Sequence, residues 1–195
     1  MKRTIGILLA AIMGCLLVSG VAQPAYAQNN PTAGNWYELF PPFFNSSAPK
    51  CLDVPNGSST DGLVLAVFHC HGYDSNGTPQ RWTFFNRGVD AQRNTLWELR
   101  NEASQRCLNI ANLTGANATQ VVQLRCNSES RGLWVVHPTT NVTPFFGLSN
   151  VQFPNLCLAT GNSSGSDHTG VEVTVCNFND SSDTAALVRQ VWSLG

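Results

Sequence analysis

Short apolar runs separated by clusters of Gly, Asn, Ser and Pro follow one another along most of the chain. Runs of this length, bounded by turn-forming residues, predict β-strands. After the first 27 residues, no segment of useful length shows the apolar periodicity of a helix. The pattern therefore predicts an all-β domain.

Four strand signals recur three times in the same order. Each copy has an aromatic segment ending in leucine, a Cys-Leu pair, a run rich in β-branched residues that ends in a second cysteine, and a tryptophan segment. The aromatic segments are 36–39, 96–99 and 145–148, the Cys-Leu pairs begin at Cys51, Cys107 and Cys157, the second cysteines are Cys70, Cys126 and Cys176, and the tryptophans are Trp82, Trp134 and Trp192. A period of about 50 to 60 residues indicates an internal repeat.

A solenoid, an array of separate beads and a closed assembly are the three ways to arrange such repeats. A unit of about 50 residues has too little core to be stable alone. Three units around a pseudo-threefold axis bury their apolar faces against one another and leave few sheet edges. Twelve strands in three sets of four predict a β-trefoil over residues 36–195, preceded by a short leader, 28–35, with the three tryptophans near the axis. The predicted repeats span about 36–88, 95–138 and 144–195.

The first 27 residues have the pattern of a secretory signal peptide. Lys2 and Arg3 precede an apolar stretch, and small residues offer a cleavage site after Ala27. The apolar stretch is shorter than the roughly 20 residues of a membrane span, which argues against an anchor. Cys15 suggests lipid attachment as an alternative, but the apolar stretch continues past it. We expect the mature chain to be secreted.

The six other cysteines form three pairs, each separated by nineteen positions. An even number of cysteines in an exported chain predicts disulfides. Metal binding is the alternative, but the cysteines lack paired CxxC spacing. We expect one disulfide in each repeat, and each closes a loop worth about 3 kcal/mol in the chain-entropy estimate. The expected pairs are Cys51–Cys70, Cys107–Cys126 and Cys157–Cys176.

The charge of the mature chain gives no reason to expect nucleic acid or anionic lipid as a partner. Removing Lys2 and Arg3 from the 11 Lys and Arg residues leaves 9, against 12 Asp and Glu, a net charge of −3. Nucleic-acid-binding domains carry basic patches instead.

Two further motifs accompany the cysteine pairs. "CLDV" begins at Cys51, and Gln-x-Trp occurs as "QRW" (80–82) and "QVW" (190–192), whereas the middle repeat has Gly132 in place of the glutamine. With these motifs the chain resembles the ricin B-chain type lectins, the QxW β-trefoil carbohydrate-binding modules, over residues 36–195. The resemblance implies that the QxW glutamines and the tryptophans are mainly core residues.

The resemblance also implies where a sugar would bind. In the family, an acid follows the Cys-Leu pair and an aromatic residue stands two positions before the second cysteine. A carboxylate accepts hydrogen bonds from vicinal hydroxyls, and a ring packs against the C–H face of a pyranose. The first repeat keeps Asp53 and Phe68, but Ala66 and Pro79 replace the glutamine and the asparagine that the family carries nearby.

Three more residues of the first repeat complete the candidate carbohydrate site: Tyr73 and Asn76 from the long loop 71–79, and Gln80. Asp53 has a structural alternative, because an aspartate can hydrogen-bond the backbone of the following turn. Phe68 has one as well, as a partly covered packing residue. Strand alternation places Leu65 and Val67 inward and Ala66 and Phe68 outward.

The other two repeats depart from the sugar-binding pattern. The second has Asn109 and Leu124 at the positions of the acid and the ring, and a bulge in its strand would turn Gln123 outward. The third has Ala159 and Thr174. We therefore expect at most one well-preserved site, in the first repeat.

The sequence offers little material for catalysis, a cofactor or a metal. The histidines are His69, His71, His137 and His168, and the "HCH" at 69–71 contains Cys70, which we assign to a disulfide. No GxSxG and no phosphate-binding glycine loop occurs. A glycosidase stays an alternative, because two carboxylates can meet in three dimensions only.

The sequence thus predicts a secreted, non-catalytic carbohydrate-binding protein with a galactose-like or polysaccharide ligand. The alternative is a trefoil with lapsed sugar sites that binds protein, as an inhibitor or as a targeting subunit resembling the ricin-like subunits of cytolethal distending toxin. The Phe-rich stretches 39–44 and 143–146 motivate this alternative, because exposed aromatic residues favour protein interfaces. Packing between repeats is the other explanation for them.

Overall fold

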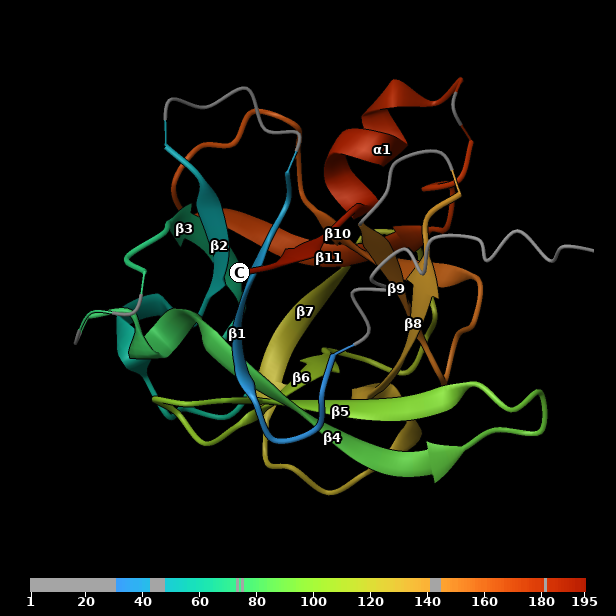
Figure 1. Ribbon diagram of the computed structural model, residues 1–195, viewed down its shortest axis with the longest axis horizontal. Coiled ribbons are helices and arrows are strands. Elements are labelled where there is room, and N and C mark those ends of the chain that lie inside the picture. The colour runs from blue at the N-terminus through green and yellow to red at the C-terminus, as the bar shows by residue number, and fades with distance from the viewer. Residues whose placement is uncertain (1–30, 43–47, 73, 75, 141–144, 181) are drawn as a thin grey trace, which may run out of the picture.

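A computed structural model of the chain describes residues 31–42, 48–72, 74, 76–140, 145–180 and 182–195. The predicted signal peptide, 1–27, therefore lies outside the described residues. Among those described, no helix has the length and apolar character needed to cross a membrane. The chain folds into twelve strands, three short 3-10 turns and one α-helix (Figure 1). The strands are β1 (Trp36–Phe40), β2 (Lys50–Asp53), β3 (Ala66–His69), β4 (Arg81–Val89), β5 (Thr95–Asn101), β6 (Cys107–Ile110), β7 (Thr119–Leu124), β8 (Leu133–Pro138), β9 (Phe146–Asn150), β10 (Leu156–Thr160), β11 (Thr169–Val175) and β12 (Ser193–Leu194).

Six strands close a barrel. β1 pairs with β4, β4 with β5, β5 with β8 and β8 with β9, and β12 returns to β1. A bridge between Phe146 of β9 and Trp192, just before β12, closes the ring. The ends of the chain's folded part therefore meet, and the C-terminus lies beside β1 (Figure 1). Because every barrel strand has two neighbours, no exposed edge remains in the ring.

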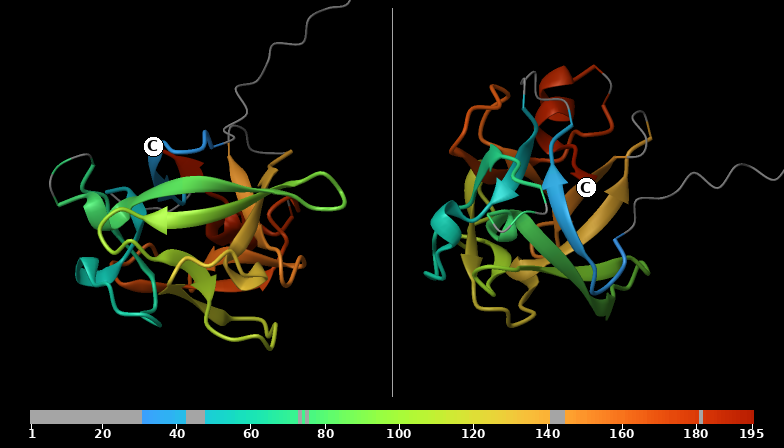
Figure 2. Two further views of the ribbon diagram at one scale, coloured as in Figure 1. Left: turned by 90° about the horizontal axis from the view of Figure 1, so that it is seen from below. Right: turned by 60° about the vertical axis from the view of Figure 1, so that its left-hand side comes forward.

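The other six strands form three hairpins, β2–β3, β6–β7 and β10–β11, at one end of the barrel. Their second strands meet around the pseudo-threefold axis through three equivalent contacts: Gly170 with Ala66, Gln120 with Glu172, and Val64 with Val122. The long β4–β5 hairpin extends across the molecule (Figure 2). This arrangement is the β-trefoil predicted from the sequence, and one disulfide staples each hairpin, as expected.

The core repeats with the chain. Trp82, Trp134 and Trp192 are fully buried in one cluster. Each indole Nε1 donates a hydrogen bond to the carbonyl oxygen of the leucine that follows the first cysteine of its own repeat, at 3.0–3.1 Å. Burying an indole of roughly 200 Å² contributes on the order of 5 kcal/mol before entropy is counted. The leucines that accept these bonds are Leu52, Leu108 and Leu158.

One element differs from the sequence prediction. Residues Thr184–Gln190 form a helix, α1, although the apolar pattern gave no helix and assigned Gln190 to a strand. The side chain of Asp183 accepts a hydrogen bond from the backbone N–H of Ala186 and caps the first turn, which stabilises a short helix that periodicity cannot reveal. The strand is consequently reduced to β12.

The described residues of the two Phe-rich stretches lie mainly in the interior of the protein. Leu39 and Phe146 are fully buried, and Phe40 and Phe145 are partly buried. Residues 43–47 and 141–144 lie outside the described residues. The described aromatic residues of these stretches therefore fit packing between repeats.

Candidate functional site

Asp53 ends β2 beside the second strand of its hairpin. It pairs with Ala66 of β3, and Cys51, two residues earlier, pairs with Phe68. The Cys51–Cys70 disulfide thus fixes the strand that carries the carboxylate against the strand that carries the ring. Leu65 and Val67 are fully buried, as alternation requires, and Phe68 is half-buried on the outer face. Ala66 is also covered, because Gly170 of β11 pairs with it.

A concave pocket of about 270 Å³ opens in front of these two residues. Asp53 and Phe68 line it together with Asn76 of the loop that follows the hairpin. Of the sequence-predicted site residues, these three come together, while Tyr73 lies outside the described residues. The other lining residues are Pro55, Asn56, His71, Pro79 and His168.

Gln80 has a different place from the one expected of a ligand-contacting residue. It is fully buried, its Nε2 donates to the carbonyl oxygen of His69 at 2.9 Å, and its Oε1 accepts from the backbone N–H of His71 at 2.8 Å. The side chain thereby clamps the residues on either side of Cys70, and it also hydrogen-bonds Asp53. Gln80 positions the carboxylate from behind rather than lining the pocket.

Asp53 is 9% exposed, and its carboxylate is held by Gln80 rather than by the backbone of the following turn. Burial raises the pKa of Asp53 from 3.8 to about 6, although the Gln80 hydrogen bond and the nearby His71, His168 and His69 act in the opposite direction. Desolvation penalises the charged form of a buried acid. The group is therefore an ionised acceptor at neutral pH and a proton donor in mildly acidic solution.

Three imidazoles surround the ring of Phe68, a feature that the sequence did not reveal. The ring centroid of Phe68 lies 4.1 Å from that of His69, 5.9 Å from that of His71 and 4.9 Å from that of His168. His168 belongs to the third repeat and reaches the first-repeat pocket from the turn before β11. Because it lies a hundred positions from Phe68 in the sequence, only the assembled trefoil brings it there.

The second repeat has lost this geometry by turning its amide inward. Asn109 is 1% exposed, its Nδ2 donates to the carbonyl oxygen of Cys107 at 3.0 Å, and its Oδ1 lies 2.6 Å from the point where a Cβ on Gly132 would stand. Asn109 therefore occupies space that a side chain at the QxW glutamine position would need. The β6–β7 register is regular, so the bulge considered for this strand is absent, and Gln123 points inward to the carbonyl oxygens of Ser58 and Thr60.

The third repeat retains the clamp without the acid. Gln190 donates to the carbonyl oxygen of Val175 at 2.6 Å and accepts from the backbone N–H of Asn177 at 2.7 Å, as Gln80 does around Cys70. Ala159, at the position of the acid, is fully buried. The QxW glutamine is thus a structural clamp on the hairpin disulfide in both repeats that have it.

A closed barrel, three disulfide-stapled hairpins and a concave pocket beside the first hairpin define the class: a β-trefoil built of three repeats with a candidate site on the first. The model of the ricin-type beta-trefoil lectin domain matches residues 42–182, and the chain belongs to this family. A comparison with curated protein sequences gives no match.

Several solved structures have a similar fold. A designed threefold-symmetric protein, ThreeFoil, matches with a TM-score of 0.63 and 21% identity, over 82% of this chain and 96% of that one. A ricin B-like lectin from Macrolepiota procera, solved in complex with lactose, matches with a TM-score of 0.58 and 21% identity, over 84% and 96%. The exo-beta-1,3-galactanase 1,3Gal43A from Clostridium thermocellum matches with a TM-score of 0.60 and 18% identity, over 84% of this chain and 30% of that one. At these identities the likeness shows the fold alone.

Proposed function

We propose that this chain is a secreted, non-catalytic carbohydrate-binding protein with one sugar site, in the first repeat. The observation that carries the proposal is the pocket in which the Asp53 carboxylate and the Phe68 ring lie on adjacent strands. A galactose-like sugar or a polysaccharide built of such units is the ligand that fits this pair of groups.

Each of the two groups has a task that suits a pyranose. Ionised Asp53, backed by Gln80, accepts hydrogen bonds from two neighbouring hydroxyls. The half-buried face of Phe68 offers an apolar surface to the sugar's C–H groups. Asn76 and His71 at the rim add polar groups that can donate to ring or hydroxyl oxygens.

The limit to one site follows from the other repeats. Asn109 is turned into the core and Ala159 has no polar side chain, so neither supplies an acceptor for hydroxyls. A lone site of this kind lacks the avidity that several sites provide. We therefore expect weak binding to monosaccharides and stronger retention on polymers that present many units.

One feature supports binding without hydrolysis, and two others support secretion. Asp53 is the one carboxylate among the described residues that line the pocket, whereas glycoside hydrolysis ordinarily needs two. The signal-like segment 1–27 and the three disulfides suit an oxidising extracellular compartment.

A glycan array probed with the disulfide-bonded protein from residue 28 onward tests the proposal, with Asp53→Asn as the site variant. The matched control is Asp90→Asn, which changes a partly exposed aspartate in the β4–β5 turn, outside the pocket. We expect a sugar signal for the parent and the control and at least a tenfold loss for Asp53→Asn. A blank array, or binding that survives Asp53→Asn, contradicts the assignment. Secretion is tested separately, by N-terminal sequencing of the protein released by its native cells.

A further inference from the structure

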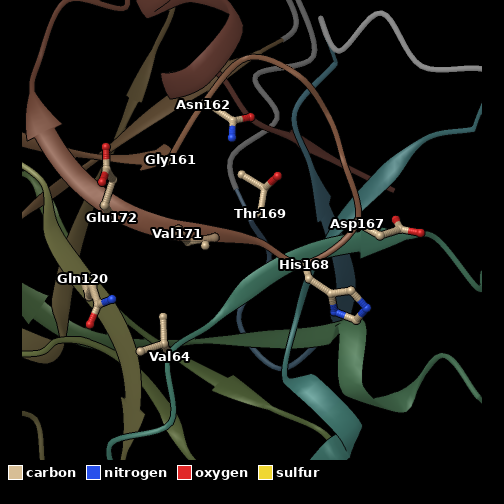
Figure 3. Close-up of a pocket in the computed structure, with 10 residues that line it drawn as sticks. Val64, Gln120, Gly161, Asn162, Asp167, His168, Thr169, Val171 and Glu172 are labelled. Atoms are coloured by element: carbon tan, nitrogen blue, oxygen red, sulfur yellow. The ribbon is translucent and has the colours of Figure 1, made fainter.

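A second hollow, of about 420 Å³, lies where the three hairpins meet, and we call it the axial groove (Figure 3). Its walls come from Val64, just before β3, from β7, and from β11 with the turn before it. The groove thus lies at the pseudo-threefold axis, whereas the Asp53 pocket belongs to one repeat. Its lining residues are Val64, Gln120, Gly161, Asn162, Asp167, His168, Thr169, Gly170, Val171 and Glu172.

The groove exists because the repeats differ at one equivalent position. Val64, Gln120 and Gly170 each stand six residues before the second cysteine of their repeat, and each makes the equivalent inter-repeat contact. The third repeat has glycine there, and a Cβ built on Gly170 would meet nothing within 4 Å. The missing side chain leaves the space open.

The same comparison singles out His168. Its equivalents, eight residues before the second cysteine, are Gly62 and Ala118, and all three have positive φ, with 65° at His168. Glycine adopts this conformation without strain, whereas a side chain there carries a cost. The backbone conformation is common to the three repeats, and only the third places a ring on it, where the others have no side chain or a methyl group.

His168 is the residue that the two hollows share. It lines the Asp53 pocket, with its ring 4.9 Å from that of Phe68, and it also lines the axial groove. The turn that carries it is tied to the first repeat by the ion pair between Lys50 and Asp167, at 2.6 Å. This contact holds the His168 turn against the hairpin that presents Phe68.

The groove suits an uncharged, hydroxyl-rich ligand. Its two acids are already paired: Asp167 with Lys50 and His69, and Glu172 with Arg189. The amide of Gln120 is exposed and has no hydrogen-bond partner among the described residues, so it offers both a donor and acceptors. Val64 supplies an apolar patch beside it.

We propose that the Asp53 pocket and the axial groove form one continuous binding surface for an oligosaccharide, with the imidazole of His168 as the wall between two sugar subsites. This inference rests on the proposed function and adds to it the length of the ligand. One sugar unit packs on Phe68 and bonds to Asp53, the chain passes over His168, and a following unit bonds to Gln120. The ligand class is therefore a neutral oligosaccharide or polysaccharide rather than a terminal monosaccharide.

Calorimetric titration with matched pairs of sugars tests the inference. The pairs are galactose with β-1,3-galactotetraose, xylose with xylotetraose, and glucose with cellotetraose. We expect at least one tetrasaccharide to bind at least tenfold more tightly than its own monosaccharide. If a monosaccharide binds and its tetramer is no tighter, the second subsite is wrong while the proposed function stands. If no sugar of the panel binds, the proposed function and this inference fall together.

Gly170→Val closes the groove with the residue that the first repeat carries at the equivalent position, Val64. We expect this variant to keep the parent's affinity for the monosaccharide and to bind the tetrasaccharide no more tightly. The ratio of tetrasaccharide to monosaccharide affinity should therefore fall to about one. Gln120→Ala, on the exposed face of β7, is the second variant and keeps the test valid if Gly170→Val folds poorly. Gln120→Ala should lower the ratio of tetrasaccharide to monosaccharide affinity at least threefold. A ratio unchanged in both variants overturns the inference.

His168→Gly tests the shared wall. Glycine suits the positive φ and matches Gly62, so the variant should fold at least as well as the parent. We expect a loss of affinity for the monosaccharide and a larger loss for the tetrasaccharide. In ¹³C-methyl spectra, the Val64 signals should shift with the tetrasaccharide and stay in place with the monosaccharide. Equal losses of affinity for both sugars in His168→Gly would contradict a second subsite. So would Val64 methyl signals that do not shift when the tetrasaccharide binds.

Discussion

The indole Nε1 of Trp134 donates a hydrogen bond to the carbonyl oxygen of Leu108 at 3.0 Å, and both groups are buried. The same bond joins Trp82 to Leu52 and Trp192 to Leu158. Each bond ties the tryptophan segment of a repeat to the strand that contains its first cysteine. The threefold repetition of one contact explains how a short unit with one disulfide joins a common core.

Replacing Trp134 with phenylalanine should therefore cost more than the lost volume alone. The carbonyl oxygen of Leu108 would be left buried without its donor, at about 1–3 kcal/mol, in addition to the cost of the smaller ring. Trp97→Phe is the matched control, because Trp97 is buried in the same cluster and its indole has no hydrogen-bond partner among the described residues. Denaturant unfolding should show Trp134→Phe less stable than Trp97→Phe by about 1–3 kcal/mol. Equal losses would show that the indole bond contributes nothing.

Gly132 and Asn109 should be energetically coupled. A Cβ on Gly132 would stand 2.6 Å from Oδ1 of Asn109, so Gly132→Ala forces the amide out of its place and should destabilise the protein by about 1–3 kcal/mol. In the background of Asn109→Ala, the same substitution should cost less than half as much. A double-mutant cycle in urea measures the coupling. Additive losses would mean that the two side-chain positions do not compete for space.

The three disulfides should contribute similarly to stability but differently to the pocket. Replacing both cysteines of a pair with serine should lower the free energy of unfolding by about 2–4 kcal/mol for each repeat. Sugar binding should suffer for the Cys51–Cys70 pair, because this bond links the strands of Asp53 and Phe68. The Cys107–Cys126 pair is the matched control, because its repeat contributes no residue to the lining of the Asp53 pocket, and it should leave the monosaccharide affinity unchanged. A loss of affinity in both variants would point to general loosening.

The buried carboxylate of Asp53 should lower stability as the pH rises. Its pKa is about 6 in the folded protein against an ordinary value of 3.8, so between these pH values the folded chain retains a proton that the unfolded chain releases. Asp53 therefore stabilises the folded protein near pH 4 relative to pH 7. This stabilisation is lost as the pH rises through about 6, and the loss lowers the free energy of unfolding by about 3 kcal/mol in total. Asp53→Asn removes the titration and should be the more stable protein at pH 8, by about 2–3 kcal/mol, with the advantage shrinking toward pH 4. A difference that is constant with pH would mean that Asp53 titrates at its ordinary pKa.

The same titration should appear in sugar binding. An ionised carboxylate can accept hydrogen bonds from two hydroxyls, and protonation removes part of this capacity. We expect the affinity to fall as the pH is lowered through about 6, the pKa of the free site. Titrations between pH 4.5 and 8 measure the effect, and the residual binding of Asp53→Asn, if measurable, should not follow this profile. An affinity that is flat across this range in the parent would show that the carboxylate is not a sugar acceptor.

Much of the fold could be predicted because its determinants are local and repeated. The nineteen-residue cysteine interval, the Cys-Leu pairs and the tryptophan segments lie within single repeats, so their spacing specifies hairpins and barrel strands directly. Asp53 and Phe68 follow from the resemblance to the ricin B-chain type lectins, and the register of one hairpin brings them close, because Asp53 pairs with Ala66 and Cys51 pairs with Phe68. The sequence did not predict the helix α1, because its seven residues are too few to show a periodic pattern and the Asp183 cap stabilises it.

By itself, the sequence determined the repeats, their disulfides and the trefoil, since all of these follow from spacing and alternation along one repeat, and the resemblance to the ricin B-chain type lectins added Asp53 and Phe68. Only the tertiary structure decided that Gln80 clamps the hairpin from inside, that Asn109 fills the place beside Gly132, and that His168 lies against Phe68 and opens onto the axial groove. These contacts join different strands or different repeats around the pseudo-threefold axis. Their geometry depends on how the three units close on one another, which no interval along a single chain segment encodes.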